Sequence, residues 1–283
     1  NPMAKSPEAD RISRRSVMKA IIAAGVGGVA GTGAYSFFYA RRNLEITRTT
    51  IFASGLPEAL SGLRIGFLTD LHRSLTVPRE DIEKAVTATM KERPDLIVLG
   101  GDYVTWRDPQ YVDDVADILA PLTAPHGVFA ILGNHDDERA MPAALTAQGF
   151  EVLMDARTRI TVASESLDLI GLRFWTRRST DVIPLLSSAT RPTIVLAHDP
   201  RRVFEAAALD LPVVLSGHTH GGQVVIPGLG AIAARKFPIA AGVFRQMNTT
   251  LFVSRGIGTV YVPFRLNCPP EVAILTLAQR PNL

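Results

Sequence analysis

Short apolar runs alternate with amphipathic segments along the first half of this 283-residue chain. Continuous apolar runs predict buried strands at residues 63–68, 96–99 and 127–132, after an opening strand at residues 44–52. Helical spacing of apolar residues predicts helices at residues 78–90, 111–119 and 140–148. Strands that alternate with helices in this way favour parallel pairing in one sheet.

The second half follows a different pattern. Residues 151–171 alternate apolar and polar positions in short pieces, which predicts an antiparallel meander. Beyond it we expect helices at residues 181–188 and 202–208 and buried strands at residues 193–197, 213–216 and 272–277. No internal repeat or linker rich in Gly, Ser and Pro interrupts the sequence there, so we expect one domain over residues 43–283.

The first 42 residues are set apart by their composition. Residues 20–40 carry no charge and include five glycines, each of which would cost a soluble helix about 1 kcal/mol. Ahead of them, Arg14-Arg15 with Lys19 behind the pair resembles the twin-arginine export signal. We therefore expect residues 1–42 to direct export by the twin-arginine machinery to the periplasm or another extracytoplasmic space.

Two fates of this segment stay open. Thr32-Gly33-Ala34 offers a small-x-small cleavage site, whereas the 21 uncharged residues approach the ~20 that a membrane-spanning helix needs. The segment is either a cleaved signal or a membrane anchor formed by residues 20–40.

The distribution of charge argues against a nucleic-acid partner, and the cysteine content excludes an intrachain disulfide. The pI is about 9.2, but residues 1–42 hold seven Lys/Arg residues against two acidic ones. The remaining 241 residues carry 23 basic against 25 acidic residues, which gives no basic footprint for nucleic acid. We therefore expect no nucleic-acid partner. Cys268 is the only cysteine, so an intrachain disulfide is excluded.

Five of the six histidines fall in short motifs that also contain an acid, an amide or glycines. Each motif follows an apolar run, which would bring all of them to a common rim of strand ends. Hard carboxylate and carbonyl oxygens mixed with imidazoles suit a pair of first-row divalent metals. In chain order the motifs are Asp70-Leu71-His72, Gly101-Asp102, Gly133-Asn134-His135-Asp136, Ala197-His198-Asp199 and Gly217-His218-Thr219-His220.

These motifs, in this order and spacing, resemble those of the calcineurin-like metallophosphoesterase superfamily, whose pattern is D-x-H, G-D, G-N-H-[DE], a lone H and G-H-x-H. The resemblance covers roughly residues 62–277. The export signal, the run Gly221-Gly222-Gln223 behind the last histidine and the late Ser254-Arg255-Gly256-Ile257-Gly258 together look like the exported or membrane-associated bacterial branch. The resemblance to the superfamily implies an α/β fold, a four-layer α/β/β/α sandwich with two mixed β-sheets.

The resemblance also implies seven metal ligands and one free histidine. His135 would stay unbound and face the substrate. The metals would be two divalent or trivalent ions, with Mn, Zn and Fe left open. The ligands would be Asp70, His72 and His220 for one ion, Asn134, His198 and His218 for the other, and Asp102 as the bridge between them.

The expected reaction is hydrolysis of a phosphoester bond. Two metals ~3.5–4 Å apart can share a hydroxide that attacks phosphorus and can stabilise the charge of the transition state. His135 would then protonate or otherwise stabilise the leaving oxygen, and Asp136 or a nearby acid would orient its ring. Candidate substrate-binding residues are Arg73, Arg255 and Arg265, with solvated arginines as the alternative.

The motifs do not specify the substrate, and two alternative functions are compatible with them. The export signal favours a phosphodiester or a pyrophosphate-linked molecule derived from lipid or the cell envelope. A phosphomonoesterase of broad specificity and a non-catalytic metal-binding scaffold of the same fold stay open. Trp106 and Trp175 form either a flap over the site or a satellite core cluster.

Replacing the arginine pair by lysines (Arg14→Lys with Arg15→Lys) should leave the protein inside the cytoplasm, because the export pathway reads that pair. Immunoblots of cell fractions measure the outcome. The control, Arg41→Lys with Arg42→Lys, should be exported like the wild type. Normal export of the first variant would contradict the export prediction.

Overall fold

A computed structural model describes residues 14–190 and 192–280 and contains two six-stranded mixed sheets. In the first sheet, β2 to β5 are parallel, as the alternation of strands and helices predicted, while β12 runs antiparallel to β2 and parallel to β1. The strand order is β1(Glu45–Ala53), β12(Glu271–Gln279), β2(Arg64–Leu68), β3(Leu96–Leu99), β4(Val128–Ala130) and β5(Glu151–Val152).

The second sheet has four parallel strands in its centre and an antiparallel strand at each edge. Its order is β10(Gly242–Gln246), β11(Thr249–Val253), β9(Val213–Ser216), β8(Thr193–Ala197), β7(Glu165–Leu172) and β6(Ala156–Val162). The meander expected at residues 151–171 is wrong in part. β6 and β7 form an antiparallel pair, but β5 follows a helical crossover and therefore pairs parallel with β4 in the other sheet.

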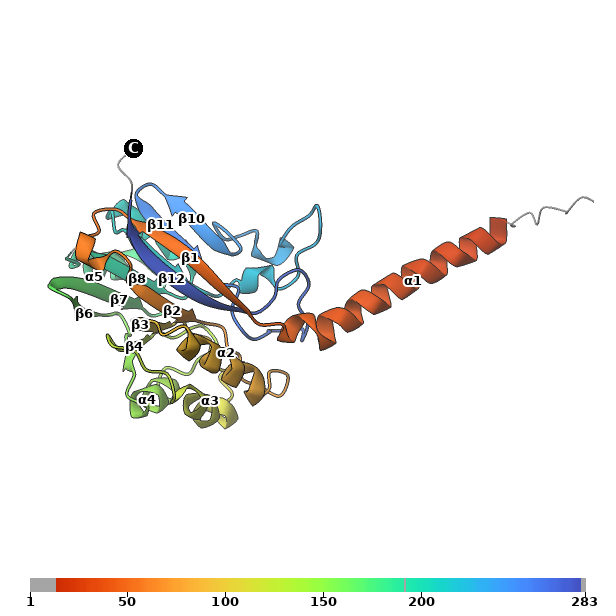
Figure 1. Ribbon diagram of the computed structural model, residues 1–283, viewed down its shortest axis with the longest axis horizontal. Coiled ribbons are helices and arrows are strands. Elements are labelled where there is room, and N and C mark those ends of the chain that lie inside the picture. Colours follow the sequence, from red (N-terminus) through yellow and green to blue (C-terminus); the bar gives the residue numbers. More distant parts are fainter. Residues whose placement is uncertain (1–13, 191, 281–283) are drawn as a thin grey trace, which may run out of the picture.

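Helices cover the outer face of each sheet, so the molecule has four layers, α/β/β/α, as expected (Figure 1). One apolar cluster fills the space between the sheets, where the rings of Phe67 and Phe252 lie 6.3 Å apart. The first sheet packs against α2(Arg79–Lys91), α3(Val112–Leu119) and α4(Ala140–Ala147), and the second against α5(Ser179–Ser187) and α6(Val203–Ala208).

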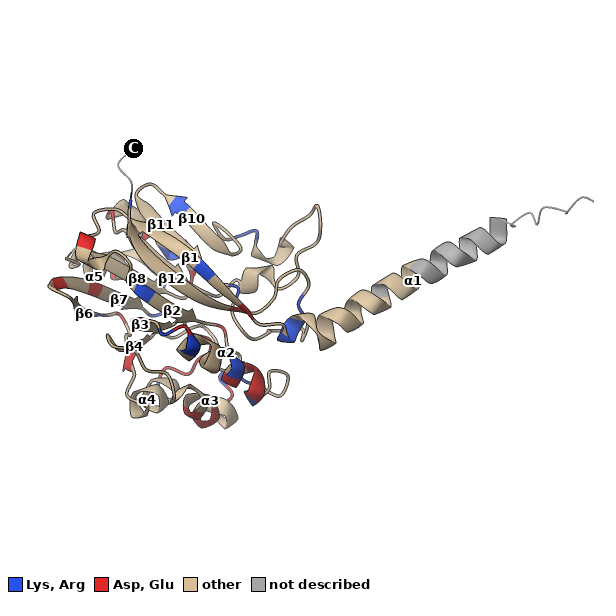
Figure 2. Ribbon diagram, in the orientation of Figure 1, with Lys and Arg blue, Asp and Glu red and all other residues tan. Residues whose placement is uncertain are grey.

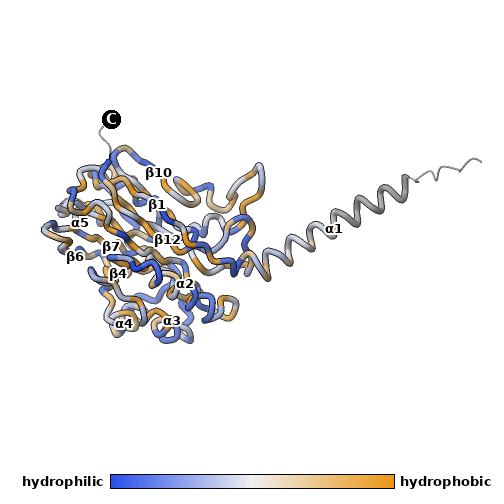
Figure 3. The backbone as a smooth tube through the Cα atoms, in the orientation of Figure 1, coloured by the Kyte–Doolittle hydropathy of each residue, from blue (hydrophilic) through white to orange (hydrophobic). Residues whose placement is uncertain are grey.

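The layers follow from local sequence patterns. All four residues of β3 are fully buried, as a strand covered on both faces requires. Figure 3 shows hydrophobic stretches recurring along the chain throughout the body of the sandwich. In α3 the buried residues Val115, Ile118 and Leu119 recur at helical spacing, while Asp113 and Asp114 lie in its first turn, where acids favour the helix dipole. The charged residues of α2 are visible in Figure 2.

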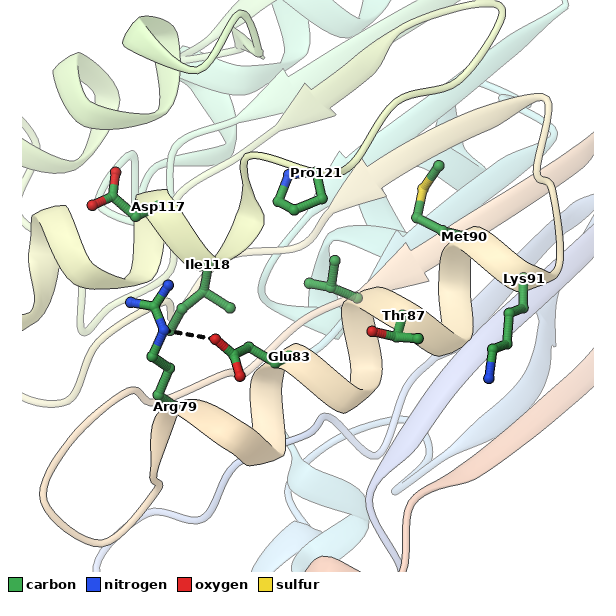
Figure 4. A pocket seen from close by; sticks show the side chains of 9 residues that line it. Arg79, Glu83, Thr87, Met90, Lys91, Asp117, Ile118 and Pro121 are labelled. Atoms are coloured by element: carbon green, nitrogen blue, oxygen red, sulfur yellow. Dashed lines mark hydrogen bonds and ion pairs between the residues drawn. The ribbon is translucent and has the colours of Figure 1, made fainter.

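A groove of about 640 Å³ lies between α2 and α3 (Figure 4). Its lining includes Glu83, Met90 and Ile118, and Glu83 pairs with Arg79 at 2.7 Å. It contains none of the residues that the sequence motifs single out, so the candidate chemistry lies elsewhere.

Helix α1(Arg14–Phe38) projects from the sandwich and is followed by the short 3-10 turn η1(Ala40–Arg42) (Figure 1). Across the part of the chain that the structure describes, no helix combines the length and hydrophobicity needed to cross a membrane. Residues 1–13 lie outside the described residues. The other 3-10 turns are η2(Glu58–Leu60), η3(Pro109–Tyr111), η4(Pro200–Arg202), η5(His220–Gly222) and η6(Ile232–Ala234).

The buried carboxylate of Asp168 in β7 accepts stabilising hydrogen bonds near the edge of the second sheet. It accepts hydrogen bonds from Arg159 Nε at 2.7 Å and from the backbone N–H of Thr190 at 2.9 Å. Burial alone would raise the pKa of Asp168, but these hydrogen bonds outweigh it and lower the pKa below its ordinary value.

Asp168→Asn should therefore lower the free energy of unfolding by about 1.5–3 kcal/mol at pH 7. Because the folded-state pKa is lowered, this stabilisation is present above the unfolded pKa of about 4 and is lost as the pH falls through the folded value. Urea unfolding at pH 7 and at low pH measures the difference. Glu151→Gln, at an exposed carboxylate, should change stability by less than about 0.5 kcal/mol, and an equal loss in both variants would contradict the assignment.

Candidate metal centre

The carboxyl ends of five parallel strands from both sheets deliver the sequence motifs. Asp70, Asp102 and His135 follow β2, β3 and β4 of the first sheet, whereas His198 and His218 follow β8 and β9 of the second. The two sheets therefore contribute to one site. His198 joins them directly, since its Nδ1 lies 2.8 Å from the carbonyl oxygen of Gly100 in the turn after β3.

Among the described residues, two groups of side chains bring three possible metal ligands together, with ligand atoms within 4.8 Å of one another. They are Asp70 with His72 and His220, and Asp102 with His198 and His218. In the first group, His220 Nε2 lies 3.3 Å from Asp70 Oδ1 and 3.1 Å from His72 Nε2.

Asp102 lies between the two groups. Its Oδ2 is 3.1 Å from His198 Nε2 and 3.5 Å from His72 Nε2, so one carboxylate oxygen contacts an imidazole of each group. Its other oxygen accepts the backbone N–H of His135 at 2.8 Å. This is the place that a bridging ligand would occupy.

The backbone is strained where it carries these ligands. Five residues have left-handed backbone conformations, with φ between 50° and 72°. Residues other than glycine seldom adopt such conformations. Such conformations persist only where the surrounding structure enforces them, and they gather at functional sites. The five are Asp70, His72, Asp102, His218 and His220.

The motif glycines allow the backbone to approach the carboxylates. A Cβ at Gly133 would lie 2.1 Å from Asp102 Oδ1, and one at Gly217 would lie 2.3 Å from Asp70 Oδ2. Both distances are far shorter than a Cβ atom can approach an oxygen, so a side chain at either position would collide with the carboxylate. Asp70 in turn accepts the backbone N–H of His218 at 3.0 and 3.1 Å. Glycine is thus required at these two positions by the site itself.

Burial sets the charge of the imidazoles. It lowers the pKa of His72 and of His218 to about 3 and also lowers the pKa of His220, so these rings are neutral at pH 7. Neutral imidazole is the form that binds a metal. For His198 burial acts in the same direction, but the adjacent Asp102 outweighs it and raises the pKa to about 10.

The donor set fits a pair of metal ions. Two buried carboxylates, four imidazoles and one amide are the mixture that first-row metals prefer. The Oδ1 of Asn134 is buried and has no hydrogen-bond partner among the described residues, although buried acceptors are nearly always paired. Asn134 follows Gly133, where a Cβ would collide with Asp102, and precedes His135, whose backbone N–H donates to Asp102. A metal at this position would satisfy the amide oxygen.

Comparison with known proteins agrees with this geometry. The family of calcineurin-like phosphoesterases matches residues 63–222, which is more than half of the chain. The chain belongs to the calcineurin-like phosphoesterase family. The matched region includes all seven expected ligands and His135.

Three relatives support this assignment. The Bacillus subtilis protein YkuE, an uncharacterized metallophosphoesterase, is 29% identical over 280 residues, covering 94% of this chain and 98% of its own length. The phosphodiesterase YaeI of Escherichia coli is 34% identical, covering 76% of this chain and 82% of its own. An uncharacterized metallophosphoesterase of Aquifex aeolicus is 31% identical, covering 84% of this chain and 94% of its own length. The protein is therefore a metal-dependent phosphoester hydrolase.

In this phosphoesterase a backbone group, and not an acid, fixes the ring of His135. The N–H of Trp106 donates to His135 Nδ1 at 3.0 Å. Nδ1 is therefore an acceptor, and the proton of the neutral ring lies on Nε2. The Trp106 ring lies 4.6 Å from that of His135 and is 63% exposed, so the alternative that places Trp106 in a satellite core cluster is wrong.

Asp136, the acid expected to orient His135, has a different task. Its carboxylate accepts the backbone N–H groups of Asp102 at 2.7 Å, Tyr103 at 2.8 Å and Gly133 at 2.8 Å. It thereby ties the turn after β3 to the turn after β4. Burial raises the pKa of Asp136 to about 7, and the charge of Asp102 acts in the same direction.

The three candidate substrate arginines are engaged elsewhere. Arg73 Nε donates to Asp114 Oδ2 at 2.5 Å, and Arg255 pairs with Glu45 at 3.0 Å. Arg265 is fully buried, and its guanidinium donates to the backbone carbonyls of residues 255, 256, 258 and 268. Burial corrects the expectation for Arg265, which is closed to substrate, whereas substrate binding by Arg73 and Arg255 stays a prediction.

Two features of the site could not be found by searching for motifs. Phe174 and Phe237 each lie 5.2 Å from the ring of His218 and pack around it. The loop that Arg265 holds also closes on Asp70, whose carbonyl accepts the N–H of Gly258 at 2.7 Å. The apolar character of the phenylalanines gives no sequence signal that separates them from core residues.

His198→Gln should remove about one equivalent of bound metal, because the imidazole is buried against Asp102 and has no substitute nearby. Elemental analysis of protein purified in the presence of Mn²⁺ or Zn²⁺ measures this, and the chelator-induced fall in melting temperature should shrink in the variant. His126→Gln, outside the motifs, should keep both ions. Unchanged metal content in His198→Gln would contradict the ligand assignment.

Proposed function

We propose that this chain is a dinuclear phosphodiesterase that acts outside the cytoplasm. The observation that carries the proposal is the position of Asp102, whose Oδ2 lies within 3.5 Å of an imidazole from each group of candidate ligands. A carboxylate in that position holds two ions at the separation that two-metal hydrolysis uses. The name of the relative YaeI, a phosphodiesterase, supports diesters over monoesters.

We assign the ligands to the two ions in the way that the sequence resemblance implies. One ion would be held by Asp70, His72 and His220, the other by Asn134, His198 and His218, with Asp102 shared. Metal ions bound there would supply charge stabilisation for the phosphoryl oxygens and a nucleophile at neutral pH. Mn, Zn and Fe all suit this donor set.

His135 is the residue that acts on the substrate. It is not part of either ligand group, and its ring lies 4.8 Å from that of His72. Because Trp106 N–H occupies Nδ1, the ring presents Nε2–H, which donates a hydrogen bond to a phosphoryl or leaving oxygen as negative charge develops there. Burial lowers the pKa of His135, which favours this neutral donor.

The place of action is inferred from the N-terminal sequence alone. Arg14-Arg15 and the uncharged segment behind the pair support export, and a substrate from the envelope or from lipid would then be within reach. Twin-arginine export would suit a protein that folds around its metals before it crosses the membrane.

Hydrolysis of bis(p-nitrophenyl) phosphate by Mn²⁺-loaded protein tests the proposal, with p-nitrophenyl phosphate as the monoester comparison. We expect faster turnover of the diester, loss of activity after chelation and recovery when metal returns. His135→Ala should keep both ions but lower kcat by about 10²–10⁴-fold.

The matched control is His126→Ala, which should retain full turnover. Activity that is indifferent to chelation would overturn the metal mechanism. Full turnover by His135→Ala with both metals bound would overturn the role of His135. Faster hydrolysis of the monoester would reassign the protein as a phosphomonoesterase.

A further inference from the structure

An apolar groove of about 470 Å³ opens beside His218 and His220. Its volume is in the range of small-molecule sites, about 300–1,000 Å³. We propose that this groove binds the hydrocarbon chain of an amphiphilic phosphoester substrate. The inference rests on the proposed function, because the same two histidines border the groove and the candidate metal centre. The apolar lining is formed by Ile226, Ile232, Phe237, Val260 and Val262.

The two walls of the groove are held together by Gln223. Its side-chain amide donates to the carbonyl of Val262 at 2.8 Å, and its amide oxygen accepts the N–H of Val260 at 3.0 Å. Gln223 itself is 7% exposed. These bonds join the segment after the last histidine motif to the C-terminal loop, so the groove is a fixed part of the fold.

The lining exposes apolar side chains that the fold leaves uncovered. Ile232 is 46% exposed and Val262 41%, and the adjacent Tyr261, also in the lining, is 78% exposed. Contiguous exposed apolar surface is costly in water and marks binding sites. A hydrocarbon chain would cover this surface while its phosphoester lies at the histidines.

The charge of the groove fits an anionic amphiphile. Among its described lining residues Lys236 is the one Lys or Arg, and none is acidic. Lys236 Nζ lies 5.1 Å from the centre of the Phe237 ring, and that ring lies 5.2 Å from His218. Lys236 therefore lines the same groove as His218 and His220, and its positive charge complements the negative charge of a phosphoester.

The groove also lies toward the base of α1. Arg41 in η1 shares a small hollow with Ile257 and Thr259, and the chain continues directly from Thr259 into the groove wall at Val260. In Figure 1 the light-blue segment that joins β9 to β10 lies on the side from which α1 leaves. The last turn of that helix exposes aromatic side chains, among them Phe38 at 71%.

Two diesters that differ only in chain length test the proposal: methyl p-nitrophenyl phosphate and octyl p-nitrophenyl phosphate, both below micellar concentrations, with full-length Mn²⁺-loaded protein. Each buried methylene improves binding about fourfold. Burial of about three of them would raise kcat/KM of the octyl ester roughly 60-fold over the methyl ester, mainly through a lower KM.

Groove variants should remove that preference. Ile232→Asn and Val262→Asn place an amide in the apolar lining and should bring the ratio of the two kcat/KM values toward one. The matched control is Leu229→Asn, which lies in the same segment and is 57% exposed but does not line the groove, and which should keep the wild-type ratio.

Equal kcat/KM for the two esters in the wild type would overturn the groove assignment and leave the proposed function standing. An octyl preference that survives both groove variants would also overturn it. Hydrolysis of neither ester by protein with both metals bound would overturn the proposed function, and this inference with it.

Discussion

The buried charge of Asp102 is the constraint on which the site depends. A carboxylate that is 2% exposed is costly unless charges and hydrogen bonds surround it. Here imidazoles from both sheets and the N–H of His135 face its oxygens, and Asp136 holds the backbone that carries it. Gly133 meets the same requirement, because a side chain there would collide with Asp102, and Gly217 and the N–H of His218 do the same for the second buried carboxylate, Asp70.

This requirement also accounts for the architecture. The carboxyl ends of parallel strands from two facing sheets bring His198 and His72 to the same carboxylate. The C-terminal loop closes the site from a third direction, because Gly258 N–H binds the Asp70 carbonyl and buried Arg265 holds that loop. The same loop then forms one wall of the apolar groove, so the candidate metal centre and the groove share a structural support.

Much of the fold was predictable because the apolar pattern is strong. β3, β8 and β9 were expected at the bounds the structure shows, since short apolar runs covered on both faces have few alternatives. β5 was mispredicted because two residues carry no periodicity, and its parallel pairing follows from α4 before it. The seven expected ligands were likewise visible as motifs, and the structure brings six of them into two groups, while the seventh, Asn134, has a buried Oδ1 without a partner among the described residues.

The sequence by itself determined the family, because the motifs depend on residue types and their spacing, and the order of the layers and the candidate metal ligands followed from what that resemblance implies. The tertiary structure alone decided that the N–H of Trp106 fixes the ring of His135, that Arg265 supports a loop and does not face substrate, and that an apolar groove adjoins His218. Those features are made by backbone groups and by side chains distant in the chain, whose contacts no local pattern records.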